Sequence, residues 1–155
     1  MVLFLLGCLT GAALFMALIY LVVPRLMFQE IRSPLGFAET VEKIQRNIAA
    51  AGVWGVVGVT EFSQNMEKHG AGTIAPMALI KFCHPHYAFN ILRHDEHKLL
   101  SALMPCTISV YQKGDGVTYV SRLNIGLMGR MFRGVVKETM VGKVAKDDIR
   151  FLNFS

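Results

Sequence analysis

Hydrophobic residues occur along this chain as one continuous run at the start and as periodic patterns after it. The segment from Val2 to Val23 contains no charged residue, and about 20 apolar residues in a helix suffice to span a bilayer. Because the run lacks a basic start and a small-residue cleavage site, it favours a retained anchor over a signal peptide. We therefore predict a transmembrane anchor over residues 1–24, a juxtamembrane linker over 25–36 and one domain over 37–155.

Beyond the anchor, segments with helical spacing alternate with segments typical of strands. Apolar residues recur every three or four positions from Phe37 to Gly52, which predicts an amphipathic helix. Four segments rich in β-branched and aromatic residues are expected to be strands, namely 53–60, 73–83, 107–113 and 117–123. Further helices are expected over 61–70, after Pro85, over 125–144 and over 147–151.

The order of these elements predicts an α+β fold: a mainly antiparallel four-stranded sheet with helices packed on one face. The most specific local signal is Lys113-Gly114-Asp115-Gly116 between the last two strands, which is typical of a β-hairpin turn.

Composition and charge indicate what the domain contacts. The chain has 155 residues, 53% of them hydrophobic, and a formal net charge of +5. Its Lys and Arg residues are dispersed, which suits an anionic membrane surface better than nucleic acid. Basic residues such as Arg25 and Arg32 follow the span, so the positive-inside rule favours a cell-membrane protein with a cytoplasmic domain. An extracytoplasmic domain is the alternative.

Side chains suited to catalysis or metal binding are concentrated between Cys83 and Cys106, a stretch that holds two of the three cysteines and four of the five histidines. Cys83, His84, His86 and Cys106 form a candidate site for a metal ion such as copper or zinc, or for haem. His94 and His97 are weaker candidate ligands, because the histidines between the cysteines also fit a solvated polar helix face.

The two cysteines lie at strand ends and have three interpretations: buried small hydrophobes, reactive or metal-binding thiols, or a disulfide. A further candidate site is Arg130, Arg133 and Lys137, whose spacing of three and four suits an anion or lipid headgroup, or a solvated helix face.

From about Phe37 to Phe132 the chain resembles the domain-of-unknown-function 302 family. Four motifs carry the resemblance: Phe37-Ala38-Glu39-Thr40-Val41, Cys83-x-Pro85-x-Tyr87-Ala88, Met104-Pro105-Cys106, and Tyr119-Val120-Ser121-Arg122-x-Asn124-x-Gly126-Leu127-Met128-Gly129-x-Met131-Phe132. The resemblance implies a bacterial or archaeal α+β domain that often dimerises, and no established activity. The chain departs from the family where His84 replaces the usual Asn and Arg133 the usual Gly.

These observations support three functional hypotheses. The first is a non-catalytic, membrane-anchored accessory domain that binds a metal, haem or sulfur species through Cys83, Cys106 and nearby histidines for a membrane redox system. The second is a thiol-dependent redox or sulfur-handling enzyme. The third is a structural subunit of a membrane complex. In each, the expected partners are the lipid bilayer and either a second copy of the chain or a larger membrane assembly.

Overall fold

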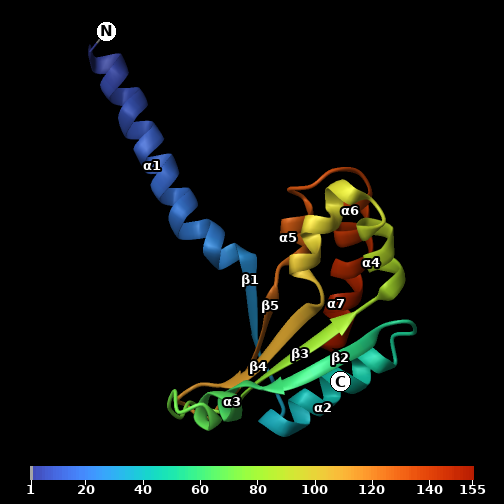
Figure 1. The fold of residues 1–155 in the computed structure, drawn as a ribbon. Coiled ribbons are helices and arrows are strands. Elements are labelled where there is room, and N and C mark those ends of the chain that lie inside the picture. The colour runs from blue at the N-terminus through green and yellow to red at the C-terminus, as the bar shows by residue number, and fades with distance from the viewer. Residues whose placement is uncertain (1) are drawn as a thin grey trace.

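A five-stranded sheet organises the computed structural model, which describes residues 2–155 (Figure 1). Its strands are β1 (Phe28–Arg32), β2 (Gly55–Glu61), β3 (Met77–Cys83), β4 (Cys106–Gln112) and β5 (Thr118–Leu123). They are arranged in the order β1-β5-β4-β3-β2, and every neighbouring pair is antiparallel.

The helices before and between the strands are α1 (Val2–Met27), α2 (Phe37–Ala49), α3 (Phe62–Lys68), α4 (Pro85–Leu92) and the 3₁₀ helix η1 (Asp95–Leu103). After the last strand follow α5 (Ile125–Gly129), α6 (Gly134–Thr139), the π-helix η2 (Met140–Val144) and α7 (Ala145–Phe151). The predicted α+β class and the β4–β5 hairpin are confirmed.

The prediction of four strands is wrong, because β1 forms a fifth strand within the segment predicted to be a linker. It pairs with β5 along its whole length, from Phe28 opposite Leu123 to Arg32 opposite Tyr119. All five residues of β1 are exposed, since it is an edge strand. Alternation of apolar and polar residues marks strands with one buried face, so β1 lacks the pattern that reveals the other strands.

The apolar helix α1 leads directly into β1. It continues through Pro24 to Met27, and Leu6–Met27 is long and apolar enough to cross a membrane, a property that signal sequences share. The Asn124 backbone N–H donates to the Met27 carbonyl (2.7 Å), and the Asn124 amide Nδ2 donates to the Leu26 carbonyl (3.1 Å). These bonds fasten the end of α1 to the start of α5.

The main hydrophobic core lies between one face of the sheet and the helices α2 and α7. Alternate strand residues point to this face, and those of the central strands that are fully buried are Ala78, Ile80, Phe82, Ile108, Val110 and Val120. Phe151 of α7 packs edge-to-face on Trp54 and Phe82, at ring-centre distances of 5.3 and 5.4 Å. Each large side chain buried in this way stabilises the fold by about 1.5–3 kcal/mol.

The helix predicted over 125–144 is interrupted, and the polypeptide turns back on itself between α5 and α6. Gly134 adopts a positive φ of 57°, a conformation that a side chain disfavours. Gly129 allows α5 to pack directly on η2, because a Cβ there would lie 2.8 Å from Met140 Cβ and Val141 Cγ2. The glycines therefore position a turn and a close approach within this region.

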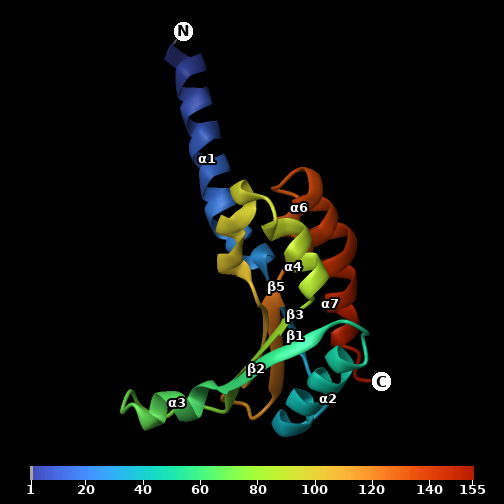
Figure 2. The same cartoon turned by 45° about the vertical axis from the view of Figure 1, so that its right-hand side comes forward.

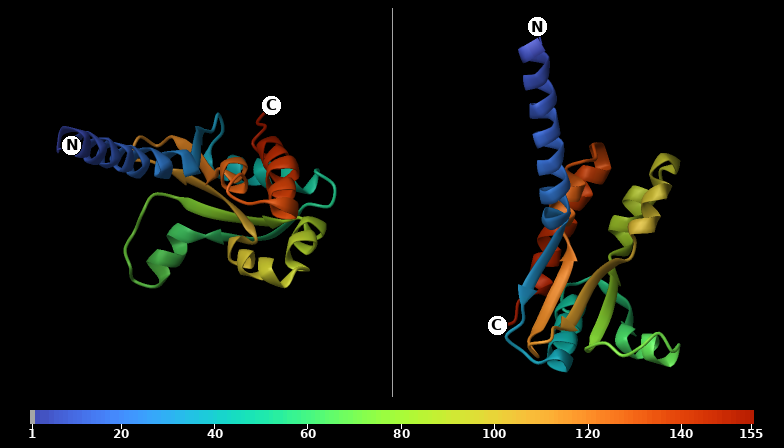
Figure 3. Two further views of the ribbon diagram at one scale, coloured as in Figure 1. Left: turned by 90° about the horizontal axis from the view of Figure 1, so that it is seen from above. Right: turned by 90° about the vertical axis from the view of Figure 1, so that its left-hand side faces the viewer.

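Several elements meet at one end of the sheet, where some strands begin and their neighbours finish. The strand register places the start of β1, the end of β5, the start of β4 and the end of β3 together. In Figures 1 and 2, α4, α5 and α6 lie at the same end of the domain from which α1 extends. Figure 3 shows α4 with η1 and the C-terminal helices rising from this end of the sheet, and Ile91, Leu100 and Val136 pack together where α4 and η1 contact α6.

Candidate functional site

A cavity of about 350 Å³ lies at this end of the sheet, with α4 and η1 on one side and the C-terminal helices on the other. Strands β3, β4 and β5 line its floor, α4 and η1 form one wall, and α5, η2 and α7 form the other. Most of its surface is apolar and comes from side chains such as Ile91, Leu100, Met104, Ile125, Met128 and Val144. The volume falls at the lower end of the range typical of small-molecule sites, about 300–1,000 Å³.

The exposed residues of the lining show where the cavity meets solvent. They are Phe28, Ala102 and Leu103, from the start of β1 and the end of η1. Phe28 directly follows α1. The mouth of the cavity therefore lies beside the C-terminal end of α1.

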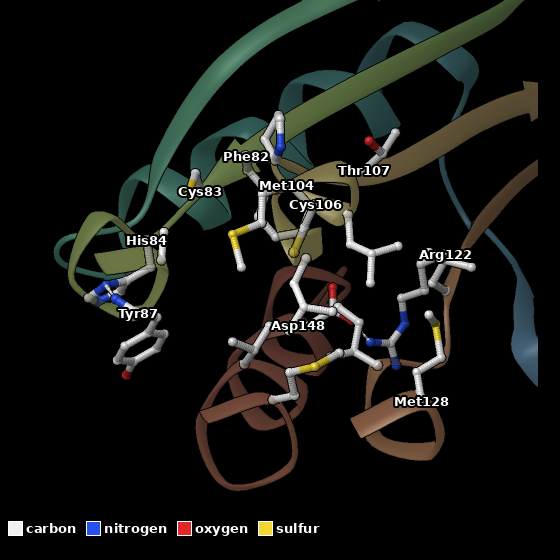
Figure 4. A pocket seen from close by; sticks show the side chains of 18 of the residues that line it. Phe82, Cys83, His84, Tyr87, Met104, Cys106, Thr107, Arg122, Met128 and Asp148 are labelled. Atoms are coloured by element: carbon white, nitrogen blue, oxygen red, sulfur yellow. Dashed lines mark hydrogen bonds and ion pairs between the residues drawn. The ribbon is translucent and has the colours of Figure 1, made fainter. Parts of the chain in front are cut away.

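An ion pair between Arg122 and Asp148 provides the charged groups of the cavity (Figure 4). Arg122 lies two residues after Val120 on β5, so its side chain points to the same buried face. Asp148 shares a face of α7 with Phe151, three residues further on, and that face is buried. Strand and helix periodicity thus bring a cation and an anion together beneath apolar walls.

This ion pair is largely withdrawn from water. The Asp148 side chain is 1% exposed and the Arg122 side chain 11%. Burial raises the pKa of Asp148 to about 6, and the nearby Arg122 guanidinium opposes that rise. The pair uses Asp148 Oδ2, whereas Oδ1 is buried and has no hydrogen-bond partner within residues 2–155. Asp148, a residue of the cavity lining, therefore carries a buried acceptor oxygen that no described residue pairs.

The two candidate cysteines point in different directions. Cys106 pairs with Phe82 across the β3–β4 ladder and shares its face, whereas Cys83 follows Phe82 and points to the opposite face. Both thiols border the cavity and, like Cys8, both are free in the described part of the chain. Burial raises the pKa of Cys83, and burial together with the charge of Asp148 raises that of Cys106 to about 12. Both thiols are therefore held protonated at neutral pH.

His84 forms part of an aromatic group at the side of the cavity, together with Trp54 and Tyr87. Its ring stacks on Tyr87 at 3.7 Å and meets Trp54 edge-on at 5.2 Å. His84 also caps α4, since its Nδ1 accepts a hydrogen bond from the Tyr87 backbone N–H (3.4 Å). Trp54 Nε1 donates to Asp147 Oδ2 (3.1 Å). Burial lowers the pKa of His84, which favours the neutral ring.

The structure brings some of the predicted metal ligands together and separates others. The rings of His84 and His86 are 5.8 Å apart, and those of His94 and His97 are 5.6 Å apart at the start of a different element, η1, which His94 precedes. Across residues 2–155 there is no group of three or more His, Cys, Asp and Glu side chains placed to hold a metal ion. Metal or haem binding thus stays a prediction from the sequence.

The three basic residues predicted to contact an anion are distributed over two elements. Arg130 directly follows α5, Arg133 precedes α6 and Lys137 lies within α6. All three are exposed. The helical spacing of the sequence does not place them in one row, because the helix is interrupted between residues 129 and 134.

The residues that give the cavity its polar character were not among the predicted site residues. Arg122 belongs to a motif shared with the family, but its charge at an inward-facing strand position was the informative signal. Asp148 occurs at a core-facing position of α7. A charged residue at the same periodic positions as buried neighbours indicates a paired charge or a binding site. Two such residues of opposite charge suggest an ion pair between them.

Comparisons with known proteins agree with the architecture. A family model described as "Domain of unknown function DUF302" matches residues 29–151. The chain is similar to a solved structure, an uncharacterised conserved DUF302 protein from Bacillus stearothermophilus, with 23% identity and a TM-score of 0.69; the match covers 81% of this chain and 95% of that one. No curated protein matches. Since the family model spans most of the sequence, the chain belongs to the DUF302 family.

Proposed function

We propose that the protein is a membrane-anchored binding domain whose cavity holds a small, mainly apolar molecule. The observation that carries the proposal is the cavity itself: about 350 Å³, lined mostly by apolar side chains, with one buried ion pair. Ligand sites in proteins share this combination of apolar walls and a few polar groups. The ligand's polar end would meet Arg122 and Asp148, and its apolar part would contact residues such as Leu100 and Met128.

The position of the mouth supports a role at a membrane. Phe28 borders the mouth and directly follows α1, the helix long enough to span a bilayer. If α1 is inserted, an apolar molecule dissolved in the bilayer lies close to the cavity. Insertion of α1 and the presence of a bilayer partner are part of this proposal. Assembly as a homo-oligomer or with a larger membrane complex stays a prediction.

The thiol-dependent enzyme has less support from the site. A thiolate is the nucleophilic form of cysteine, whereas burial raises the pKa of both Cys83 and Cys106. A metal, haem or sulfur species bound through these cysteines also stays a prediction. The structural-subunit hypothesis does not require a cavity, so ligand binding separates it from the proposal.

Quenching of Trp54 fluorescence tests the proposed function directly. Trp54 is the single tryptophan of the chain and lines the cavity, and bromine quenches indole emission on close contact. In full-length protein reconstituted in lipid nanodiscs, ω-bromodecanol is expected to quench Trp54 with a saturable dependence on concentration. Ala88→Phe, which fills space at the cavity wall, should abolish saturation, and Ala38→Phe on the exposed surface of α2 should leave it intact. Linear quenching that is the same in all three proteins would contradict the proposal.

A further inference from the structure

The polar atoms of the cavity narrow the chemistry of its ligand, and this inference rests on the proposed function. Asp148 Oδ1 is a buried carboxylate oxygen that lacks a hydrogen-bond partner in the described part of the chain. Buried polar atoms are nearly always paired, because an unpaired one forfeits its hydration without a replacement. The ligand is therefore expected to bring a hydrogen-bond donor to Asp148.

Arg122 adds a requirement for an acceptor. A guanidinium group carries five N–H donors, and within residues 2–155 the hydrogen bond found for the Arg122 guanidinium is the one from Nη1 to Asp148 Oδ2. Figure 4 shows the guanidinium directed toward Asp148, among the side chains that line the cavity. A group that donates to Asp148 can at the same time accept from a second N–H of Arg122. A hydroxyl group has this pair of properties.

The charge of the site favours an uncharged ligand. Arg122 and Asp148 neutralise each other, so the cavity offers no net charge to balance an ion. A carboxylate head group would have no proton for Asp148 and would repel it in a medium of low dielectric constant. An ammonium group would be repelled by Arg122 in the same way. A pure hydrocarbon would leave Asp148 Oδ1 unpaired.

We propose that the cavity binds a neutral, lipid-soluble molecule that ends in a hydroxyl group, either an alcohol or a phenol. The hydroxyl donates to Asp148 Oδ1 and accepts from Arg122, and the hydrocarbon part lies along the apolar walls of α4, η1 and α5. The arrangement distinguishes such a molecule from a fatty acid of the same chain length and from an alkane.

Three probes of equal chain length test this assignment: ω-bromodecanol, ω-bromodecanoic acid and bromodecane. Their dissociation constants are measured at neutral pH by quenching of Trp54 in the wild type and in the variant Arg122→Met/Asp148→Leu. Comparing each probe between proteins cancels its partition into the lipid. Hydrogen bonds to charged groups contribute about 1.5–3 kcal/mol, so the variant should bind the alcohol roughly tenfold to a hundredfold more weakly and bromodecane equally well. The exposed ion pair of α2 provides the control Arg46→Met/Glu42→Leu, which should change neither constant.

If the double variant does not fold, a fourth probe tests the same assignment in the wild type. The methyl ether of ω-bromodecanol accepts a hydrogen bond but donates none, so the wild type should bind it roughly tenfold more weakly than the alcohol. Equal binding of alcohol, ether and bromodecane would overturn the hydroxyl assignment while leaving the proposed function standing. Binding of the acid as tight as that of the alcohol would also overturn it. If no probe quenches Trp54 saturably, the proposed function itself fails.

Discussion

Removing one partner of the Arg122–Asp148 ion pair should destabilise the domain more than removing both. Arg122→Met leaves a carboxylate that is 1% exposed without its cation. Asp148→Leu leaves a guanidinium that is 11% exposed without its anion. In the double variant both charges are replaced by apolar groups next to an apolar cavity.

The size of the effect follows from the burial of the two groups. Breaking a buried pair by deleting one partner costs about 3–5 kcal/mol, because the remaining charge is desolvated and unpaired. Replacing both partners by apolar residues is often neutral, or stabilising by about 1–4 kcal/mol. We therefore expect each single variant to lose about 3 kcal/mol of unfolding free energy and the double variant to lose about 1 kcal/mol or less.

Urea unfolding of the full-length protein in detergent micelles, followed by Trp54 fluorescence, measures these changes. Trp54 is 6% exposed within the main core, so its emission reports loss of tertiary packing. The variants Arg46→Met and Glu42→Leu remove an exposed pair on α2 and should each cost less than about 1 kcal/mol. The reasoning is refuted if the two single changes at the buried pair add up to the loss in the double variant.

Three further predictions concern pH, packing and thiol reactivity. Because burial raises the pKa of Asp148 from 3.8 to about 6, the folded state binds its proton more tightly than the unfolded state. Its contribution to the unfolding free energy should therefore fall by about 3 kcal/mol in total as pH rises from well below 4 to well above 6. Urea titrations should lack this component in the double variant, and identical pH profiles in the wild type and the double variant would contradict it. Gly129→Ala should lower the unfolding free energy by about 1–3 kcal/mol, because the added Cβ would lie 2.8 Å from two side chains. In the same unfolding assay Gly126→Ala should lower it by less than about 1 kcal/mol, because the added Cβ would have its nearest neighbours at 3.6 Å. Alkylation of Cys106, followed by mass spectrometry, should be at least about a hundredfold slower in folded than in unfolded protein, because its pKa is raised to about 12; comparable rates would revive the thiol-enzyme hypothesis.

The elements that sequence patterns predicted well are those with one buried face. Strands β4 and β5 alternate buried residues such as Val110 and Val120 with less buried ones, and a turn signal joins them. The amphipathic pattern of α2 follows from burial of Ile44 and Ile48. In such elements a period of two or of 3.6 is a direct consequence of packing, so the sequence reveals it.

The missed features depend on contacts between distant segments. The edge strand β1 has both faces exposed, and its pairing with β5 leaves no periodic trace. The turn between α5 and α6 depends on the close packing of Gly129 against η2. The cavity lies between η1 on one side and α5 and α7 on the other, and its ion pair joins Arg122 to Asp148 across 26 positions of sequence. Local periodicity cannot indicate which elements meet.

The stretch from Cys83 to Cys106 illustrates the same distinction at the site. The sequence correctly drew attention to this region, because both cysteines and His84 border the cavity. It suggested sulfur and imidazole chemistry, whereas in the structure burial raises the pKa of both thiols, and His84 caps a helix and stacks on Tyr87. The composition of a segment indicates which groups are near one another, and the environment determines their protonation.

A crystal structure of the full-length protein with ω-bromodecanol tests the central claim most directly. Anomalous scattering from bromine locates the end of the chain, and the electron density locates the hydroxyl. The account predicts bromine among the apolar side chains of the cavity and the hydroxyl within hydrogen-bond distance of both Asp148 Oδ1 and Arg122. A bromine site on the outer surface, with the cavity free of ligand density at saturating probe, would contradict it.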